Sequence, residues 1–334
     1  MRMPDIDLVF TYVDGTDPVH VARLAQCRRA QACGADQSVF PSIRPSWYRH
    51  VNEITYSVRS AVRFLPWLRK IFIVTDAQSP PVDPALLASG KVQVVDHSAI
   101  IPERYRPVFD STIIESFLHR IEGLSDVFLY NNDDMLFGQP LAPEAFVAPD
   151  AEGRLQLQVM TQPGILRTGI ALASAFSPAF LPRANTFTAG IANAGSLLRD
   201  RLGLRWNEIV YPRHFTHVYR VATARRIEIE LADRLEPARM RHLRSHRQLS
   251  WMTLAYSAET RWYRPVCRSR PSSDRLFLDF GLYRSDQRLA RSWNTLANSK
   301  ASFICLNNIP ESQASQFARV MASRGLGEPL GATG

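Results

Sequence analysis

Four short β-branched runs that end in acidic or polar residues constrain the fold of this chain more than any other feature. They are IDLVFTYVD at 6–14, KIFIVTD at 70–76, KVQVVDH at 91–97 and VFLYNNDD at 127–134. Near-continuous apolar runs of this length suit strands that are covered on both faces, as in a parallel sheet. Helical patterns at 52–63 and 111–121 lie between them. This alternation predicts an α/β fold with a Rossmann-like, mostly parallel sheet sandwiched by helices.

The rest of the chain is predicted to complete the same domain. At 334 residues it is long enough to bury one large core. We expect a single domain over 1–324 and a frayed tail at 325–334. Two regions, 20–46 and 141–210, are interpreted as insertions or mobile segments that surround the cleft. Periodicity also predicts a helix at 223–239, a strand at 302–307 and a helix at 311–323.

The positive charge is concentrated and almost entirely guanidinium. The chain has 40 Lys and Arg against 31 Asp and Glu, and residues 201–300 hold 20 of the basic and 9 of the acidic side chains. Arginine suits bidentate binding of phosphate or carboxylate. The alternatives are nucleic acid, an anionic membrane surface, or a merely solvated face. No aromatic stripe is interleaved with these arginines, so we expect no nucleic-acid partner.

The cysteines and the apolar stretches indicate the compartment. The four cysteines form no CxxC pair, which removes the usual basis for a structural zinc site and favours a reducing compartment. The amino terminus lacks the apolar core of a signal peptide. The most apolar stretch, 169–181, has 13 residues, whereas a membrane span needs about 20. We expect a cytoplasmic protein, at most peripheral to the inner face of the cell membrane.

Acidic residues recur where the predicted strands end. Asp14, Asp76, Asp96 and the pair Asp133 and Asp134 all follow apolar runs. The alternative for any one of them is a turn-forming residue, the interpretation we favour for Asp76 and Asp96 taken singly. Ligands of open α/β sheets bind beyond the carboxyl ends of the strands, so together these residues predict a polar ligand cleft. Asn132, Asp133 and Asp134 offer the oxygen ligands that suit a phosphate-bound divalent cation.

Four segments, in order, resemble the conserved regions of the Stealth family. The first is IDLVFTYVDGTDP at 6–18. The second comprises NEITYSVRS at 52–60, PWLRKIFIVTDAQSP at 66–80, VVDHS at 94–98 and IIESFLHRIEGLSDVFLYNNDDMLFGQP at 113–140. The third is His217, TARRIEIEL at 223–231 and Arg244-Ser245, and the fourth is FICLNN at 303–308. The family is one of hexose-1-phosphate transferases, which implies a GT-A-like fold with inserted loops and helices around the cleft.

The resemblance also implies roles for individual residues. The catalytic group it implies is Asp134, His217, Arg244 and Glu115, with Arg244 on phosphate. It places Asp133 and Asp134 at the metal, with Mg²⁺ or Mn²⁺ as the cofactor. It implies that Asp14 and Gly15 line the nucleotide-sugar site, to which we also assign Asn132 and Arg59. Arg59 lies on the predicted helix after the first strand, where it could bind phosphate or simply pair with an acid. Either His217 or Asp134 could be the general base, and the sequence does not choose between them.

The function implied is transfer of a sugar-1-phosphate from a UDP-sugar, with N-acetylglucosamine-1-phosphate as the expected group, to a glycan hydroxyl. The products would be UMP and a phosphodiester-linked capsular or surface polysaccharide. Such a transition state spreads negative charge over phosphoryl oxygens, which cations and guanidinium groups would stabilise. Two alternatives remain open: a metal-dependent glycosyltransferase that releases UDP, and a non-catalytic protein that binds anionic glycans.

Overall fold

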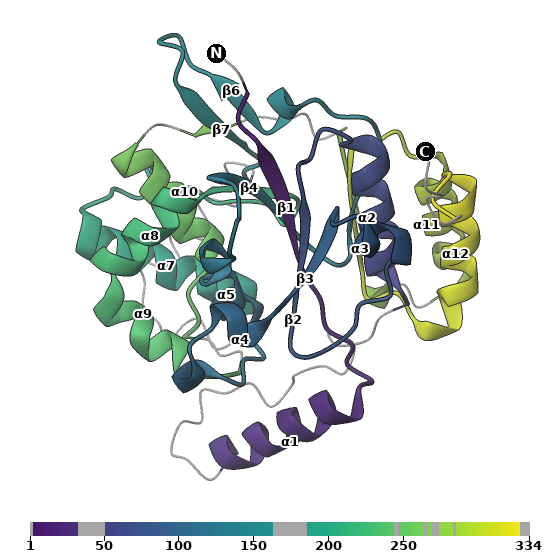
Figure 1. Cartoon of the computed structure of the whole chain (residues 1–334), viewed down its shortest axis with the longest axis horizontal. Helices are drawn as coiled ribbons and strands as arrows, with labels where there is room; N and C mark the ends of the chain where they lie inside the picture. Colours follow the sequence, from purple (N-terminus) through teal and green to yellow (C-terminus); the bar gives the residue numbers. More distant parts are fainter. Residues whose placement is uncertain are drawn as a thin grey trace.

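A five-stranded sheet forms the centre of the molecule (Figure 1). The computed structural model describes residues 3–32, 51–162, 186–243, 247–263, 266–268, 274–282 and 285–327. The strand order is β3-β2-β1-β4-β8, where the strands are β1 (Ile6–Thr11), β2 (Ile71–Thr75), β3 (Val92–Asp96), β4 (Val127–Asn132) and β8 (His217–Arg220). The first four strands are parallel and β8 is antiparallel to β4. The prediction of a mostly parallel α/β sheet is therefore confirmed.

Two three-stranded sheets flank the central one. Their orders are β10-β11-β5 and β6-β7-β9. The strands are β5 (Met135–Phe137), β6 (Val147–Pro149), β7 (Leu155–Val159), β9 (Cys267–Arg268), β10 (Arg275–Asp279) and β11 (Phe303–Asn307). β5 begins directly after Asp134, and it pairs with β11 so that Met135 lies opposite Cys305. The chain therefore passes from the turn after β4 directly into a second sheet.

Helices cover both sides of the central sheet. The α-helices are α1 (Pro18–Ala32), α2 (Glu53–Phe64), α3 (Pro84–Ala88), α4 (His97–Ile100), α5 (Ser111–Glu115), α7 (Thr186–Leu202), α8 (Val221–Glu230), α9 (Ala232–Arg239), α10 (Trp251–Trp262), α11 (Asp286–Asn298) and α12 (Ala314–Ser323). Short 3-10 helices span Glu103–Tyr105, Leu118–Arg120, Pro143–Ala145, Phe280–Leu282 and Glu311–Gln313. Figure 1 shows α7 to α10 on one side and α2, α11 and α12 on the other. Across the described residues, no helix has both the length and the apolar composition that a membrane span requires.

The predicted helix over 111–121 is interrupted. Asp110 begins it by accepting hydrogen bonds from Thr112 N at 3.0 Å and Thr112 Oγ1 at 2.9 Å. α5 then ends at Glu115, because the next residue, Ser116, bonds elsewhere: its hydroxyl donates to Ile113 O at 2.7 Å, and its carbonyl accepts from Arg239 at 3.0 Å. A side chain that competes for backbone partners in this way disfavours the helix interior. The early end leaves Glu115 in the last turn of α5.

The predicted helix over 223–239 is two helices, α8 and α9, that meet at Leu231. The helical period nevertheless holds across the break, because Ile227, Leu231 and Leu235 are all buried. Hydrophobic spacing therefore located the buried face correctly but could not reveal the change of direction.

The prediction of only loops and short elements over 141–210 was wrong for 186–202, which form the 17-residue helix α7. Its Gly and Ala content lets it approach its neighbours closely. A Cβ at Gly190 would lie 3.2 Å from the Gln248 side chain, and one at Gly195 would lie 3.1 Å from the Trp206 ring. Small residues that usually indicate loops are here required by packing. Residues 163–185, also in this region, lie outside the described residues.

The start of the expected tail is held in place. Leu326 is buried, and the carbonyl oxygens of Leu326 and Gly327 accept hydrogen bonds from Arg59 at 3.1 and 3.0 Å. Arg63 donates to Gly325 O at 2.8 Å. Residues 325–327 are therefore not frayed, while 328–334 lie outside the described residues.

Candidate active site

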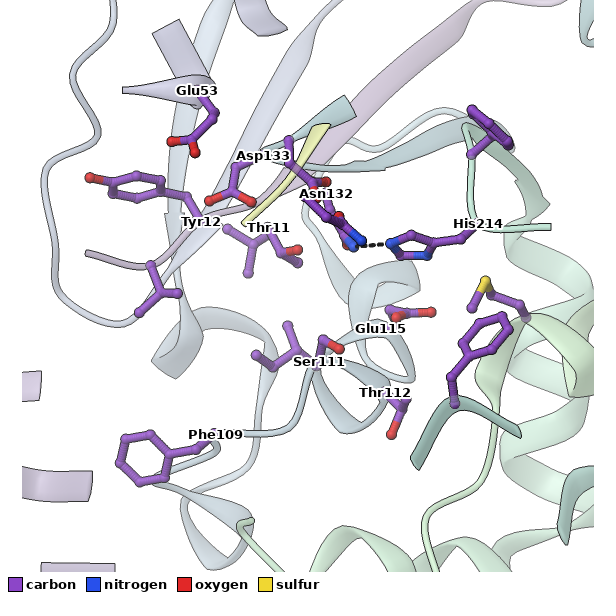
Figure 2. Close-up of a pocket in the computed structure, with 18 of the residues that line it drawn as sticks. Thr11, Tyr12, Glu53, Phe109, Ser111, Thr112, Glu115, Asn132, Asp133 and His214 are labelled. Atoms are coloured by element: carbon purple, nitrogen blue, oxygen red, sulfur yellow. Dashed lines mark hydrogen bonds between the residues drawn. The ribbon is translucent and has the colours of Figure 1, made fainter. Parts of the chain in front are cut away.

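A cavity of about 730 Å³ opens at the carboxyl edge of the parallel strands. Its walls come from the ends of β1, β2 and β3, from α5, from the turn after β4, from residues 213–215, and from β10 and β11. This is the edge at which ligands of open α/β sheets bind. Figure 2 shows polar side chains from several of these elements turned toward one another.

Carboxylates gather in the turn after β4. Asp133, Asp134 and Glu53 all line the cavity. Burial, followed by the negative charge of Glu53, raises the pKa of Asp134 from 3.8 to about 7. Burial and the charges of Asp134 and Glu53 also raise the pKa of Asp133 well above its usual range. No Arg or Lys of the described residues forms a salt bridge with Asp133 or Asp134, so nothing in that part of the chain neutralises the pair.

Asp134 belongs to a candidate metal site that also includes His214 and Cys305. One ligand atom from each of the three residues lies within 4.8 Å of the others. Cys305 Sγ lies 3.9 Å from Asp134 Oδ2. Asp134 Oδ1 is buried and has no hydrogen-bond partner among the described residues. A buried orphan oxygen within an uncompensated acidic group is what a bound cation would satisfy, so these residues fit a divalent metal.

Hydrogen bonds fix the polar wall beside that site. Tyr130 Oη donates to Asn132 Oδ1 at 2.7 Å and also lies 3.1 Å from Thr11 Oγ1. Asn132 Nδ2 lies 3.3 Å from His214 Nε2, the contact that is dashed in Figure 2. The amide of Asn132 thus links the end of β1 to the imidazole of His214.

Glu115 lies at the end of α5 on the wall that faces Asn132 and His214 (Figure 2). Its side chain is buried from bulk solvent and yet lines the cavity. The structure therefore brings together four of the residues expected from the sequence: Glu115, Asn132, Asp133 and Asp134.

Asp14 and Gly15 do not line the cavity; their neighbours Tyr12 and Val13 do. The Asp14 carboxylate accepts hydrogen bonds from Thr16 N at 2.8 Å and Thr16 Oγ1 at 2.6 Å. The backbone of Asp14 is paired with the Gln78 side chain. In this structure Asp14 shapes the loop that presents Tyr12.

Arg59 also lies away from the cavity. It forms a bidentate pair with Asp83, at 3.0 Å from Nε and 2.6 Å from Nη2, and both side chains are buried. Its remaining bonds go to the carbonyl oxygens of Leu326 and Gly327. Arg59 therefore has a structural role: it links α2 to the segment before α3 and to the backbone of Leu326 and Gly327.

We predict that Arg59→Ala lowers the free energy of unfolding by about 3 kcal/mol, because it leaves the buried Asp83 carboxylate without its guanidinium. Urea denaturation measures the change. Arg63→Ala, one turn further along α2 and exposed, is the matched control and should cost less than about 1 kcal/mol. A loss of nucleotide-sugar affinity with unchanged stability would instead support the binding role expected from the sequence.

His217 is on β8, and only 3% of it is exposed. Its ring stacks on Tyr130 and Tyr219, and Nδ1 lies 3.2 Å from Tyr256 Oη. It is not among the residues that line the cavity. Burial, with a smaller contribution from His214, lowers the pKa of His217 from 6.5 to about 3. The imidazole is therefore neutral at physiological pH and is poorly suited to titrate during a reaction.

This buried histidine should make the protein acid-sensitive. The unfolded chain binds a proton at His217 below pH 6.5 whereas the folded chain does not until about pH 3, so stability is lost as pH falls through that window. Between pH 7 and 5 we expect the wild type to lose about 2 kcal/mol more than His217→Phe, which keeps the ring stack but cannot titrate. Urea denaturation at both pH values measures this. Equal losses would show that the pKa of His217 is the same in the folded and unfolded chain.

Arg244 lies outside the described residues, so its expected phosphate contact stays a prediction. His214, Glu53 and Cys305 were not singled out as site residues by the sequence. Two of them had a signal: Glu53 and Cys305 fall inside the segments NEITYSVRS and FICLNN. His214 had none beyond its place three residues before His217, and only the folded chain brings it to Asp134.

The fold and site define a class: an α/β protein with an acidic cleft and a candidate metal site at the carboxyl edge of a parallel sheet. Comparison with known proteins adds the family. Residues 47–155 match the model of Stealth protein CR2, conserved region 2. This match confirms, for that region, the resemblance to the Stealth family that the sequence motifs predicted.

The names of curated relatives agree with this match. The chain is 40% identical over 147 residues to a capsular polysaccharide phosphotransferase of Actinobacillus suis, an alignment that covers 44% of this chain and 38% of the relative. It is 32% identical over 254 residues to an exopolysaccharide phosphotransferase of Nocardia farcinica, covering 74% of this chain and 44% of the relative. The alignments thus span less than half the length of these relatives.

Likeness to solved structures is weak. The galactosyltransferase LgtC, in a complex with donor and acceptor sugar analogs, gives a TM-score of 0.42 at 11% identity, with 95% of this chain and 96% of that chain covered. A likeness at this level supports no conclusion about ligands or chemistry.

Proposed function

We propose that this chain transfers a sugar-1-phosphate from a UDP-sugar to a hydroxyl of a glycan, releasing UMP and forming a phosphodiester in a capsular or surface polysaccharide. The observation that carries the proposal is the pair Asp133 and Asp134, which no described Arg or Lys neutralises, beside His214 at the carboxyl edge of the sheet. Such a site suits a cation and the phosphates it neutralises. The names of the relatives as phosphotransferases support the reaction type.

Asp134 and His214 are the residues proposed to hold a divalent cation, with Cys305 beside them. Asp133, also expected at the metal from the sequence, is not one of these three grouped residues but lines the same cavity. A bound Mg²⁺ or Mn²⁺ would supply positive charge to the donor pyrophosphate. The carboxylate oxygens of this set suit either ion. Asn132, fixed by Tyr130, contacts the imidazole of His214 and helps to orient it.

The nucleotide is proposed to lie over the ends of β1, β2 and β3. Tyr12, Val74 and His97 line this part of the cavity, and Phe109 adds an aromatic face. A nucleotide in this place would direct its phosphates toward the turn after β4. N-acetylglucosamine as the transferred sugar, and action at the inner face of the cell membrane, are carried forward from the sequence as parts of the proposal.

Glu115 is proposed as the general base. Its carboxylate faces the candidate metal site across the cavity, whereas the His217 imidazole is buried behind Tyr130. In the reaction, the acceptor oxygen forms a bond to the phosphorus nearer the sugar as its proton passes to Glu115. The bond from that phosphorus to the bridging oxygen breaks, and UMP leaves with the bond's electron pair. Proton transfer of this kind contributes about 10²–10⁴-fold.

The test is the identity of the released nucleotide. Purified protein is given UDP-N-acetylglucosamine, Mn²⁺ or Mg²⁺ and a glycan acceptor, with EDTA as the control. Metal-dependent, acceptor-dependent UMP is expected. Release of UDP would instead establish a glycosyltransferase, and no nucleotide release across a panel of UDP-sugars and acceptors would favour the non-catalytic alternative.

A further inference from the structure

A strip of two arginines and two phenylalanines borders the cavity on the side of β10. Arg213, Phe215 and Phe277 line the cavity, and Arg275 precedes Phe277 on β10. We call these four residues the Arg–Phe strip. Phe277 is 47% exposed, and its ring meets the buried Phe215 edge-on at 6.5 Å between centroids. An exposed aromatic ring supported by a buried one is a ready face for an apolar partner.

Strand register places this strip beside the candidate metal site. β10 runs parallel to β11, with Phe277 paired with Cys305 and Arg275 paired with Phe303. Paired residues of neighbouring strands are about 4.8 Å apart and project to the same face. Since Cys305 Sγ is 3.9 Å from Asp134 Oδ2, Phe277 lies one strand away from the cluster. Arg275 lies on the same face about 7 Å further along β10.

The two guanidinium groups of the strip are not neutralised by acids in the described part of the chain. Arg213 Nε donates to Thr161 O at 2.9 Å, which fixes the orientation of its side chain. Neither Arg213 nor Arg275 forms a salt bridge with a described carboxylate. Burial and the positive charge of Arg213 lower the pKa of Arg275, an effect that the adjacent Asp274 partly opposes. Two arginines that repel each other favour an anion between them.

We infer that the Arg–Phe strip is the subsite for an anionic glycan. One sugar ring packs on Phe277, and a singly charged group of the same chain, either a phosphodiester or a carboxylate, is bound by Arg213 and Arg275. The description of this glycan as the acceptor rests on the proposed function. Its binding to the strip does not, because it requires neither donor nor turnover. The acceptor would then already carry negative charge, as a growing phosphodiester-linked polymer does.

Calorimetric binding without any donor tests the inference. The probes are a phosphodiester-linked tetramer of N-acetylglucosamine-1-phosphate, tetragalacturonate, and neutral chitotetraose. At low salt we expect at least one anionic probe to bind with at least about tenfold higher affinity than chitotetraose. The probe that does so identifies the charged group that the strip binds. Arg275→Gln and Arg213→Gln should each weaken the anionic probe by about tenfold and leave chitotetraose unchanged. Phe277→Ala should weaken every probe that binds.

The matched control is Arg291→Gln on the exposed face of α11, which should change no affinity. Because Arg213 also bonds to the backbone of Thr161, a melting curve is measured for each variant. If Arg213→Gln does not fold, Arg275→Gln alone tests the inference. Equal affinity for charged and neutral probes, or anionic binding that survives Arg275→Gln, overturns the inference. A failed UMP assay with intact anion binding would remove the proposed reaction but keep this subsite.

Discussion

Asp134→Asn is expected to abolish turnover and, in the same protein, to raise the melting temperature of the metal-free form at pH 8. Removing a carboxylate ligand should cost at least about 10³-fold in rate, since the amide neither neutralises a cation nor replaces its charge on the phosphates. The gain in stability has a separate cause: the folded chain holds Asp134 beside Glu53 in a buried setting that penalises the ionised form.

The direction of the stability change follows from the pKa of Asp134. The folded pKa is about 7 whereas the ordinary value is 3.8, so between these values the folded chain binds more protons than the unfolded chain. Stability therefore falls as pH rises through this window, and above pH 7 the full penalty is present. Asparagine cannot ionise, so Asp134→Asn does not carry this penalty in the free energy of unfolding. Each kcal/mol recovered should raise the melting temperature by about 2 °C in a chain of this size.

Asp126→Asn is the matched control, because Asp126 is exposed at the opposite end of β4. It should change neither rate nor melting temperature. Millimolar Mn²⁺ should stabilise the wild type and leave Asp134→Asn unchanged, since a ligand stabilises only the form that binds it. If Asp134→Asn melted lower than the wild type at pH 8 without metal, the Asp134 carboxylate would have a neutralising partner and the candidate metal site would be wrong.

The sequence predicted the parts of this fold that depend on strand burial. β1, β2 and β4 are buried on both faces, so their apolar runs were continuous, whereas the edge strand β3 exposes Gln93 and Val94. The ends of all four strands were located within three residues. α7 was missed because Gly190 and Gly195 serve helix packing, a requirement set by the side chains of Gln248 and Trp206 outside the helix. A local pattern contains no information of that kind.

The residues of the candidate site also differ in whether the sequence could predict them. Asn132, Asp133 and Asp134 could be predicted, because the end of a parallel strand fixes where its following residues lie. The choice of histidine could not. His214 and His217 are three residues apart, yet β8 buries one among tyrosines while the preceding segment turns the other into the cavity. Arg59 is the converse case: the sequence left phosphate binding and pairing with an acid open for this residue, and the structure pairs its guanidinium with Asp83, 24 residues further along the chain.

Glu115→Gln is expected to reduce turnover by about 10²–10⁴-fold while leaving metal affinity unchanged. The substitution preserves the size of the side chain and its place at the end of α5 but removes the ability to accept the proton of the attacking hydroxyl. Glu115 is not one of the three residues grouped around the candidate metal position, so cation binding should not depend on it. Single-turnover rates and Mn²⁺ titration, measured on the same preparation, separate the two effects.

The matched control is Glu122→Gln, an exposed acid a few residues past α5, which should alter neither quantity. His214→Ala provides the complementary result, because losing the imidazole should weaken Mn²⁺ binding, and saturating metal should then restore part of the rate. Three outcomes distinguish the roles. A slow Glu115→Gln variant with normal metal affinity would show that Glu115 accepts the proton of the attacking hydroxyl. One with weakened metal affinity makes Glu115 a ligand. If its turnover is unimpaired, proton transfer belongs to another group on the cavity wall, and His214 becomes the first to test.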